Sequence, residues 1–408
     1  MRALFFLETP HRLGGAPRSL LATLTRLPAF GVKPIAVFPA EGSVEELFRA
    51  NGVETRIVPA PEALLLFNKQ LLALSKAEQL RVLVSDLLPY NLEIARLVRL
   101  LRADVVHFNT PRGILVAGLA ARLARRPTCL HVRGATDFLA KPLWTACQVL
   151  ADRIVLVARA LEPDVMRPFR HKATVVYNGI AALNPPDKVT ARRTLAERLG
   201  RPEIATGERV LVVSLSSYTP FKGLHHLFSA TAMARARGAP IHVVCAGGGN
   251  DARYRDYLVR LRTELELEST IDIIGFSNDP LTILAAADVL VLPTVLRERL
   301  TIGQDVLEVR CSEGLPRSIL EAMALGVPCI ATDVAGVREQ LDHRVTGLVV
   351  PPGDAESLAR ALCEAASNAT WRLDAGARAR EVVRERFSLD IAAQGLANVL
   401  GSLASAAS

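Results

Sequence analysis

Short apolar runs alternate with helix-length segments along nearly the whole chain of 408 residues, and this alternation constrains the fold more than any other feature. Short runs that are apolar throughout are typical of parallel strands buried on both faces. Helical patterns such as Arg18–Leu27, Val44–Asn51 and Ile114–Ala124 separate them. The first series of runs predicts one doubly wound α/β unit, with strands at Ala3–Leu7, Pro34–Phe38, Val105–His107, Thr128–Val132, Arg153–Val157 and Thr174–Tyr177.

A second series of apolar runs follows and predicts a second unit of the same kind, with strands at Arg209–Leu215, Ile241–Ala246, Thr270–Ile274, Val289–Pro293, Pro328–Thr332 and Gly347–Val350. Pro185 and Pro186 lie between the two series, and proline removes a backbone donor and disfavours helix. We therefore place the hinge near Ile180–Asp187. The predicted fold is α/β, with two Rossmann-like doubly wound parallel-sheet domains over 1–182 and 183–388 that face each other across a cleft, and an amphipathic helix and tail over 389–408.

The composition excludes several classes of protein. Half of the residues are hydrophobic and 22% are charged, which is typical of a globular protein rather than a fibrous or disordered one. A spanning helix needs about 18 consecutive apolar residues, whereas the best candidate, Ile283–Pro293, is interrupted by Asp288. The first eight residues read as a strand and not as a signal peptide, so we expect a cytoplasmic protein. The six cysteines form no C-x-x-C pair, which predicts neither a structural metal nor a disulfide framework.

The excess positive charge belongs to the first half of the chain. Residues 1–182 contain 24 basic and 14 acidic residues, whereas residues 183–408 contain 25 and 27. A basic surface favours anionic partners such as membrane headgroups or phosphorylated acceptors. We do not read the excess as nucleic-acid recognition. Peripheral attachment to the cytoplasmic face of a membrane and an unspecific surface excess both remain open.

The most specific stretch of the sequence runs from Ser312 to Pro328. It contains two glutamates eight positions apart, Glu313 in a predicted loop and Glu321 in a helix that begins near Arg317. Eight residues of helix span about 12 Å, so with its first member in a loop the pair can still face one ligand across the helix N-terminus. Free amides at a helix N-terminus suit a diphosphate.

These residues resemble the retaining glycosyltransferases of GT-B architecture that carry an E-x7-E motif, often called family 4. The resemblance extends over most of the chain and is strongest from Val210 to Asp354. It implies that the domain of residues 1–182 binds the acceptor and that of residues 183–388 the nucleotide-sugar, and that the helix in 389–408 packs back on the first domain. It implies that Glu313 contacts hydroxyls of the donor sugar and that Glu321 contacts the ribose of the nucleotide. It also implies that the start of the helix meets the diphosphate, through Gly314, Leu315, Pro316, Arg317 and Ser318.

Lys222 follows a predicted strand and a Pro-Phe turn, so it lies where a phosphate would be held. An ammonium group there makes a charge-assisted contact that strengthens as the nucleoside diphosphate leaves. The family usually has an arginine five residues earlier, where this chain has Ser217. Either another arginine, with Arg317 as our candidate, supplies the second charge, or the activity is weak.

Three further segments match the donor side of the family. Gly247 lies in a glycine-rich turn after a predicted strand, and Phe276 lies in a loop that resembles the one bracketing the nucleotide base. Gly14 and Gly15 match the glycine loop that approaches the donor phosphate or the acceptor. We favour this functional reading of Gly14 and Gly15, with a tight strand-to-helix turn as the alternative.

The family often has a His-Gly pair near the reacting sugar, at the end of the strand predicted at Thr128–Val132. Here the pair is Arg133-Gly134, and His131 lies two residues earlier on the same face of the strand. Which of His131 and Arg133 faces the donor stays open. His107 and Asn109, at the end of the preceding strand, are candidates for the acceptor side, with a core polar role as the alternative.

An insertion runs from Val295 to Cys311, where the family has only a few residues, and it is rich in charge. It predicts a flap over the donor sugar, a contact surface for the acceptor, or a neutral surface excursion. The sequence alone does not choose among these three.

The resemblance implies an enzyme that moves a sugar from a UDP- or GDP-sugar to an acceptor hydroxyl with retention of configuration. It implies no bound cofactor and no metal, and an acceptor that is lipid-linked, anionic or a saccharide, in polysaccharide or glycolipid synthesis. The spacing of the glutamates by itself does not distinguish transfer from hydrolysis by paired carboxylates. A nucleotide-sugar epimerase and a sugar-nucleotide-binding protein without turnover are the alternatives.

Overall fold

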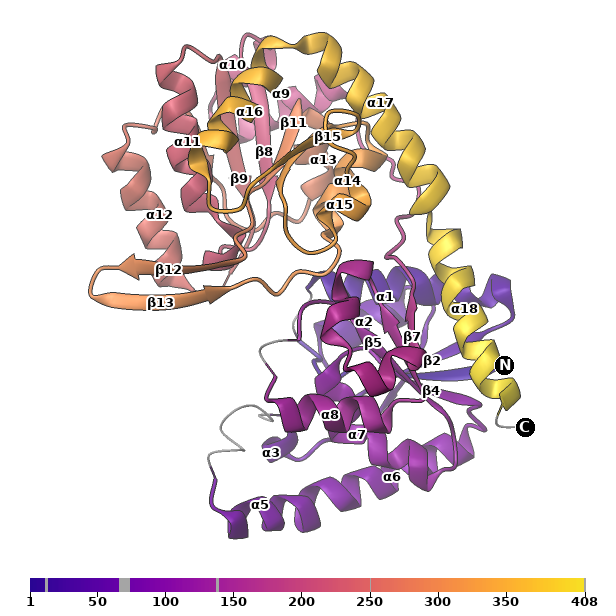
Figure 1. The fold of residues 1–408 in the computed structure, drawn as a ribbon. Helices are drawn as coiled ribbons and strands as arrows, with labels where there is room; N and C mark the ends of the chain where they lie inside the picture. The colour runs from indigo at the N-terminus through magenta and orange to yellow at the C-terminus, as the bar shows by residue number, and fades with distance from the viewer. Residues whose placement is uncertain (12–13, 66–73, 137–138, 250, 407–408) are drawn as a thin grey trace. The chain divides into compact units, whose positions relative to one another are not determined.

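The computed structural model describes residues 1–11, 14–65, 74–136, 139–249 and 251–406. The chain forms two compact units (Figure 1), the first made of Met1–Ala181 with Ser388–Ser408 and the second of Ala182–Phe387. The two parallel sheets confirm the predicted fold class. The terminal helix, which we expected to pack back on the first domain, belongs to the first unit.

The first unit is built on a seven-stranded parallel sheet. Its strands are ordered β3-β2-β1-β4-β5-β6-β7. The chain therefore adds β2 and β3 on one side of β1 and then β4 to β7 on the other side of β1. The point where the direction reverses lies between β1 and β4, and ligands of such sheets bind outside the carboxyl ends of the strands at this point. The strands are β1 (Arg2–Phe6), β2 (Lys33–Phe38), β3 (Glu54–Ile57), β4 (Val105–Phe108), β5 (Thr128–Val132), β6 (Arg153–Leu156) and β7 (Ala173–Val175).

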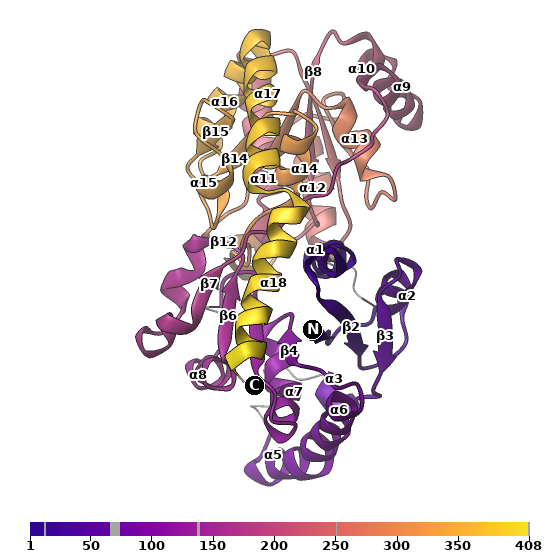
Figure 2. The same ribbon diagram turned by 90° about the vertical axis from the view of Figure 1, so that its right-hand side faces the viewer.

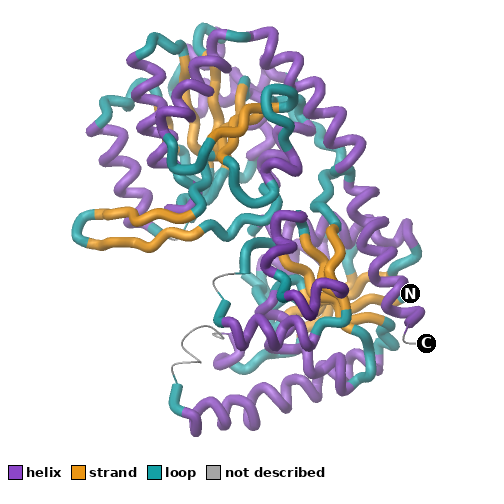
Figure 3. Tube along the Cα trace, in the orientation of Figure 1, coloured by secondary structure: helices purple, strands orange, loops and turns teal. Residues whose placement is uncertain are grey.

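Helices cover both faces of this sheet (Figure 3). They are α1 (Gly15–Arg26), η1 (Leu27–Phe30), α2 (Ser43–Ala50), α3 (Glu62–Leu65), α5 (Lys76–Val82), the π-helical η2 (Leu83–Leu87), α6 (Leu88–Leu100), α7 (Pro111–Leu123), α8 (Lys141–Leu150), η3 (Arg159–Asp164), η4 (Arg167–Lys172) and α18 (Leu389–Ala406). Helix α18 packs on α1, where Leu396 and Leu400 join Leu20 and Leu24 in one buried cluster. Figure 2 shows α18 running beside β4. The end of the chain therefore completes the core of the first unit.

The second unit repeats this plan with a six-stranded parallel sheet in the order β10-β9-β8-β11-β14-β15. Its point of reversal lies between β8 and β11. The strands are β8 (Val210–Leu215), β9 (Ile241–Ala246), β10 (Ile271–Ile273), β11 (Val289–Leu292), β14 (Cys329–Thr332) and β15 (Gly347–Val350). The helices are α9 (Lys188–Leu199), α10 (Pro202–Thr206), η5 (Pro220–Lys222), α11 (Leu224–Ala236), α12 (Ala252–Glu264), α13 (Pro280–Ala286), α14 (Arg317–Ala324), α15 (Val337–Gln340), α16 (Ala355–Ser367) and α17 (Ala369–Arg386).

The predicted insertion folds as an antiparallel hairpin of β12 (Arg297–Ile302) and β13 (Asp305–Arg310). Gly303 has φ +63°, a left-handed conformation that favours glycine, and it lies at the turn between the two strands. Leu300, Ile302 and Val309 are buried and join the core of the second unit. The hairpin is therefore anchored to its own unit by an apolar face, while polar side chains occupy most of its other positions.

Within the described residues, the structure contains no helix with the length and apolar character needed to cross a membrane.

Candidate functional site

Polar side chains gather at the carboxyl ends of the strands next to the point of reversal in each unit. In the second unit they come from the loop after β8 and from the segment that follows β11 and the hairpin. In the first unit they come from the ends of β1, β4 and β5. Both places are where ligands of open α/β sheets bind.

Gly223 fixes the backbone that carries Lys222. It has φ +66°, and a Cβ atom at this position would lie 2.0 Å from the carbonyl oxygen of Pro293. This distance is too short for any side chain, so only glycine lets the turn approach the end of β11. As a result, Lys222 is held beside the segment that leads to Glu313.

Lys222 and Glu313 form an ion pair although 91 residues separate them in the sequence. Their side chains are 15% and 14% exposed. Burial lowers the pKa of Lys222 to about 8, and its ammonium group lies 5.2 Å from the centre of the Phe221 ring. A diphosphate can take the place of the carboxylate beside this ammonium because both are anionic oxygen ligands.

The second glutamate of the motif pairs with an arginine on its own helix. Arg317 Nε donates to Glu321 Oε1 at 2.7 Å across the first turn of α14. The loop before the helix is held by two further hydrogen bonds, from Gly336 N to the Gly314 carbonyl at 2.8 Å and from Gln340 Nε2 to the Pro316 carbonyl at 2.9 Å. The structure thus ties Arg317, our candidate for the second cation, to Glu321.

The remaining residues of this loop differ in exposure. Gly314, Leu315 and Pro316 are buried, whereas Ser318 is half-buried at the start of α14. Ser318 is therefore more accessible than the loop before it, and amides at a helix N-terminus are suited to a diphosphate.

A glycine turn and an aromatic ring complete this side. A Cβ atom on Gly247 would lie 1.7 Å from the Ser216 carbonyl oxygen, which explains the glycine by close backbone approach. Ser217 Oγ lies 3.2 Å from Thr219 Oγ1. The Phe276 side chain is 62% exposed, and it lies against Gly248 of the same turn. An exposed ring of this kind can stack on a nucleotide base.

In the first unit, the predicted histidines form a buried pair. His107 Nε2 lies 3.2 Å from His131 Nδ1, and both side chains are enclosed. Burial lowers the pKa of His107 to about 3 and holds that of His131 well below its usual value, so both imidazoles are neutral at pH 7. Their outer nitrogens, His107 Nδ1 and His131 Nε2, are buried without a hydrogen-bond partner.

Arg133 lies next to this pair and binds two amide oxygens. Its Nε donates to Asn109 Oδ1 and its Nη1 to Asn178 Oδ1, both at 2.9 Å. Burial lowers the pKa of Arg133 to about 9. A half-buried guanidinium held by neutral amides keeps much of its attraction for an anion.

Gly14 and Gly15 stand at the start of α1, where Gly14 is the N-cap residue. Among the residues that the structure describes, no heavy atom lies within 4 Å of a Cβ atom built on either glycine. Packing against these residues therefore does not require glycine at the two positions.

Glu8, which follows β1 at the point of reversal, was not among the site residues predicted from the sequence. It accepts a hydrogen bond from Thr110 Oγ1, and burial raises its pKa. A carboxylate directly after the first buried strand is the signal that would have drawn attention to it.

Solved structures of the same fold match both units. HepE of Anabaena, solved in complex with UDP-glucose, aligns with 98% of this chain and all of its own chain at a TM-score of 0.79 and 20% identity. Sucrose-phosphate synthase of Thermosynechococcus elongatus aligns over 99% of both chains at a TM-score of 0.72 and 17% identity. Two Rossmann-like units with a site at each point of reversal define a protein of GT-B architecture.

The family follows from two sequence models that match consecutive parts of the chain. Residues 13–182 match the model described as Glycosyltransferase Family 4, and residues 199–382 match the one described as Glycosyl transferases group 1. The chain belongs to this family, the group 1 glycosyltransferases of GT-B architecture.

Curated relatives are similar over part of their length. The putative colanic acid biosynthesis glycosyltransferase WcaL of Salmonella typhimurium is 30% identical over 54% of this chain and 52% of its own. A GDP-mannose-dependent alpha-(1-6)-phosphatidylinositol monomannoside mannosyltransferase of Mycobacterium tuberculosis is 33% identical over 49% of both chains. The matched segments thus span about half the length of these relatives.

Proposed function

We propose that this protein transfers a sugar from a nucleoside-diphosphate sugar to an acceptor hydroxyl in the synthesis of a polysaccharide or glycolipid. The observation that carries the proposal is the pair of Lys222 and Glu313 at the point of reversal of the second sheet. Membership of the family and the matched relatives, which are named for colanic acid and phosphatidylinositol mannoside chemistry, support it.

The donor is proposed to bind to the second unit. Lys222 and the amides at the start of α14 hold the diphosphate, Glu313 turns to the sugar hydroxyls and Glu321 to the ribose. Phe276 lies where a base can stack, since its ring is 62% exposed beside the Gly247–Gly249 turn. Binding of the donor would separate both ion pairs. Each carboxylate would then bind a hydroxyl in place of its cation, and each cation would contact a phosphate or solvent.

The transfer step is proposed to proceed with retention of configuration. The bond from the anomeric carbon to the diphosphate oxygen breaks, and a bond to the acceptor oxygen forms on the same face of the sugar. The acceptor proton passes to the departing diphosphate. Lys222 stabilises the charge that develops on the leaving group, a contact that is stronger in the transition state than in the ground state. These steps need no metal ion and no bound cofactor.

The acceptor is proposed to bind to the first unit. This side offers a cluster of two neighbouring hydrogen-bonded pairs, the enclosed neutral imidazoles of His107 and His131 and the Arg133 guanidinium with the Asn109 amide. Such a cluster suits a hydroxyl-rich or anionic acceptor, because its donors and acceptors are fixed before the ligand arrives. Glu8, whose raised pKa reflects burial, belongs to the same edge of the sheet.

The donor can be identified by a screen of UDP-, GDP- and ADP-sugars. We expect one nucleotide class to raise the melting temperature of the full-length protein and to release its nucleoside diphosphate when an acceptor is added. UDP-glucose and GDP-mannose are the first to test, because HepE was solved with UDP-glucose and the Mycobacterium tuberculosis relative is GDP-mannose-dependent. Release of an epimer from the donor alone would favour the epimerase, and binding without turnover would favour a sugar-nucleotide-binding protein.

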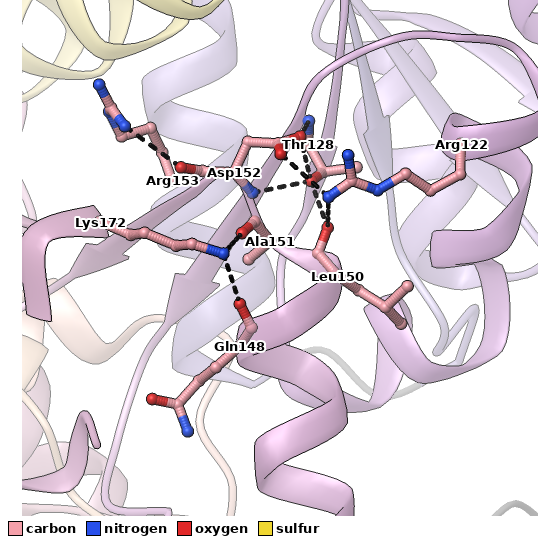
Figure 4. Close-up of polar contacts among 8 residues, drawn as sticks. All are labelled: Arg122, Thr128, Gln148, Leu150, Ala151, Asp152, Arg153 and Lys172. Carbon is pink, nitrogen blue, oxygen red and sulfur yellow. Dashed lines mark hydrogen bonds and ion pairs between the residues drawn. The ribbon is translucent and has the colours of Figure 1, made fainter. Parts of the chain in front are cut away.

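Attachment to the cytoplasmic face of an anionic membrane is proposed from the charge of the first half of the chain. Some of these basic side chains bind partners within the first unit (Figure 4). Arg122 Nη2 pairs with Asp152 Oδ1 at 2.9 Å, and Lys172 Nζ donates to the carbonyl oxygens of Gln148 and Ala151 at the end of α8. Arg125, Arg126 and Arg153 line a neighbouring groove of about 470 Å³.

Each basic side chain near an anionic surface contributes about 1 kcal/mol, so several together would suffice for reversible attachment. Co-sedimentation with vesicles of defined anionic-lipid content should show binding that weakens with salt. Binding that is independent of salt would indicate apolar insertion instead, and no binding would favour a soluble acceptor.

A further inference from the structure

Two consecutive histidines at the start of α11 meet a glutamate of the hairpin. His225 Nε2 lies 2.7 Å from Glu298 Oε1, and His226 Nε2 lies 2.7 Å from Glu298 Oε2. The ligand atoms of the three side chains all lie within 4.8 Å of one another. In the described part of the chain, this is the one group of three histidine, cysteine or acidic side chains with that spacing.

Tyr254 orients His225, the buried member of the group. The His225 side chain is 8% exposed, and its Nδ1 lies 2.8 Å from the hydroxyl oxygen of Tyr254. Its other nitrogen, Nε2, is directed toward Glu298 Oε1, yet neither atom has a hydrogen bond of acceptable geometry. A nitrogen lone pair and a carboxylate oxygen repel each other at this distance unless a cation or a proton lies between them.

A metal ion can serve as that cation, because the ligand atoms of two imidazoles and a carboxylate already lie close together. Neutral imidazole and ionised carboxylate are the forms that bind metals.

We propose that His225, His226 and Glu298 bind one divalent transition-metal ion of the Zn²⁺ class. Two imidazole nitrogens and a carboxylate oxygen are ligands that suit Zn²⁺, Co²⁺ or Ni²⁺, whereas Mg²⁺ and Ca²⁺ prefer sites made of oxygen. Metal–ligand distances of about 2.1 Å place tetrahedral ligand atoms roughly 3.4 Å apart, which small side-chain shifts achieve here. Water completes the fourth position, and Tyr254 holds His225 as such partners commonly do.

This ion would join the hairpin to α11. The apolar contacts of the hairpin come from Leu300, Ile302 and Val309, whereas its outer positions are open, with Val306 59% exposed. Strand β13 continues through Cys311 into the loop of Glu313. The ion therefore stabilises the position of the hairpin and takes no part in the transfer step proposed above, so the two proposals fail independently.

The test uses the full-length protein after removal of metals with a chelator. Titration calorimetry with ZnCl₂ should show one equivalent bound, and CoCl₂ should give the visible absorption of a tetrahedral site without the intense near-ultraviolet band of a thiolate ligand. Glu298→Gln and His226→Gln should each weaken binding at least tenfold. Glu308→Gln, the same change on the same hairpin, and His171→Gln, at an exposed histidine, are the matched controls and should bind as the wild type does.

Hydrogen exchange provides a second readout that does not depend on activity. Zn²⁺ should slow exchange of the amides of residues 297–310 in the wild type and leave them unchanged in Glu298→Gln, after circular dichroism has shown that the metal-free variant is folded. Absence of binding below millimolar Zn²⁺, equal affinity of wild type and Glu298→Gln, or a thiolate band with Co²⁺ would each overturn the proposal and leave the three residues as a plain ion pair. If Glu298→Gln does not fold, the Zn²⁺ affinity and hydrogen exchange of His226→Gln test the proposal by the same criteria.

Discussion

The polar clusters at the two points of reversal compensate their charges in different ways. In the second unit the cations stand beside carboxylates, Lys222 with Glu313 and Arg317 with Glu321, and all four side chains keep some contact with solvent. In the first unit the Arg133 guanidinium is half-buried, and the neutral amide oxygens of Asn109 and Asn178 accept its hydrogen bonds. The same topology thus presents an ion-paired site in one unit and an amide-held cation in the other.

The difference suggests two ways of preparing a site for an anion. An ion pair can exchange its carboxylate for a phosphate with little change in the number of charged contacts, so the second unit can bind and release a charged product. A cation held by amides retains more of its field, because neutral groups screen it less than a carboxylate does. We therefore expect the second unit to dominate catalysis and the first to position the acceptor.

The largest expected effect comes from breaking the pair in the second unit. Lys222→Met keeps the aliphatic stem over Phe221 and removes the charge that would stabilise the leaving diphosphate. The turnover number should fall roughly 10²–10³-fold, as for loss of one donor to a developing anion. Steady-state kinetics of nucleoside diphosphate release would measure it.

Lys188→Met is the matched control for this change. Lys188 also pairs with a carboxylate of the second unit, Asp288 at 2.7 Å, but its side chain is 51% exposed. Exposed pairs contribute about 0–1 kcal/mol to stability, so this variant should keep both its fold and its turnover. Near wild-type turnover in Lys222→Met would refute the phosphate assignment.

Replacing the cation of the first unit should give a smaller and different effect. In Arg133→Gln the amide can still bond to Asn109, but the charge is lost. Hydrogen bonds to a charged group contribute about 1.5–3 kcal/mol, so kcat/KM for the acceptor should fall about 10- to 100-fold. Calorimetric affinity for UDP or GDP should stay within twofold, and Arg96→Gln, at an exposed arginine of the same unit, should behave as the wild type. A parallel loss of nucleotide affinity would contradict the division of roles.

Adding a cation to the second unit tests whether its site is complete. Ser217→Arg restores the arginine that the family usually has, and one further charge-assisted contact should tighten binding of the nucleoside diphosphate about tenfold. Calorimetry with the free diphosphate measures this directly. An unchanged affinity would mean that another cation already fills the place, and the same substitution combined with Arg317→Gln would show whether that cation is Arg317.

The smallest expected effect is a pH dependence of nucleotide binding. Burial lowers the pKa of Lys222 to about 8, so the ammonium form that attracts phosphate is present below this pH and is lost above it. Affinity for the nucleoside diphosphate should therefore fall about fourfold between pH 7 and pH 8.5. Lys222→Arg keeps its charge over this range and should flatten the profile. A profile that is flat in the wild type would show that Lys222 does not titrate there.

The strands of both sheets were predicted from the sequence nearly to the residue, with two informative exceptions. Strand β3 (Glu54–Ile57) was missed, because this edge strand is polar and half-exposed and has no apolar run. The hairpin was recognised as a charged insertion but not as two strands. The alternation of buried and exposed residues that marks a strand is short in both strands of the hairpin. Apart from it, Gly303 was the one local sign of the turn between them.

The candidate site was predictable where its residues lie in one motif and not where they come from distant segments. The loop of Glu313 and the helix that begins at Arg317 follow from local turn and helix signals. The group of His225, His226 and Glu298 was missed because 72 residues separate the second histidine from the glutamate. Glu8 was missed because a single carboxylate after a strand has no distinctive pattern.

The sequence by itself determined the order of strands and helices, the position of the junction and the glycine turns, because apolar periodicity and backbone sterics act over a few residues. The tertiary structure decided which side chains meet. Lys222 reaches Glu313, and His107 reaches His131, because parallel pairing brings the carboxyl ends of neighbouring strands to one edge. The tertiary structure also decided which charged side chains form ion pairs or hydrogen bonds, because burial and the choice of partner depend on packing between segments that are far apart in the chain.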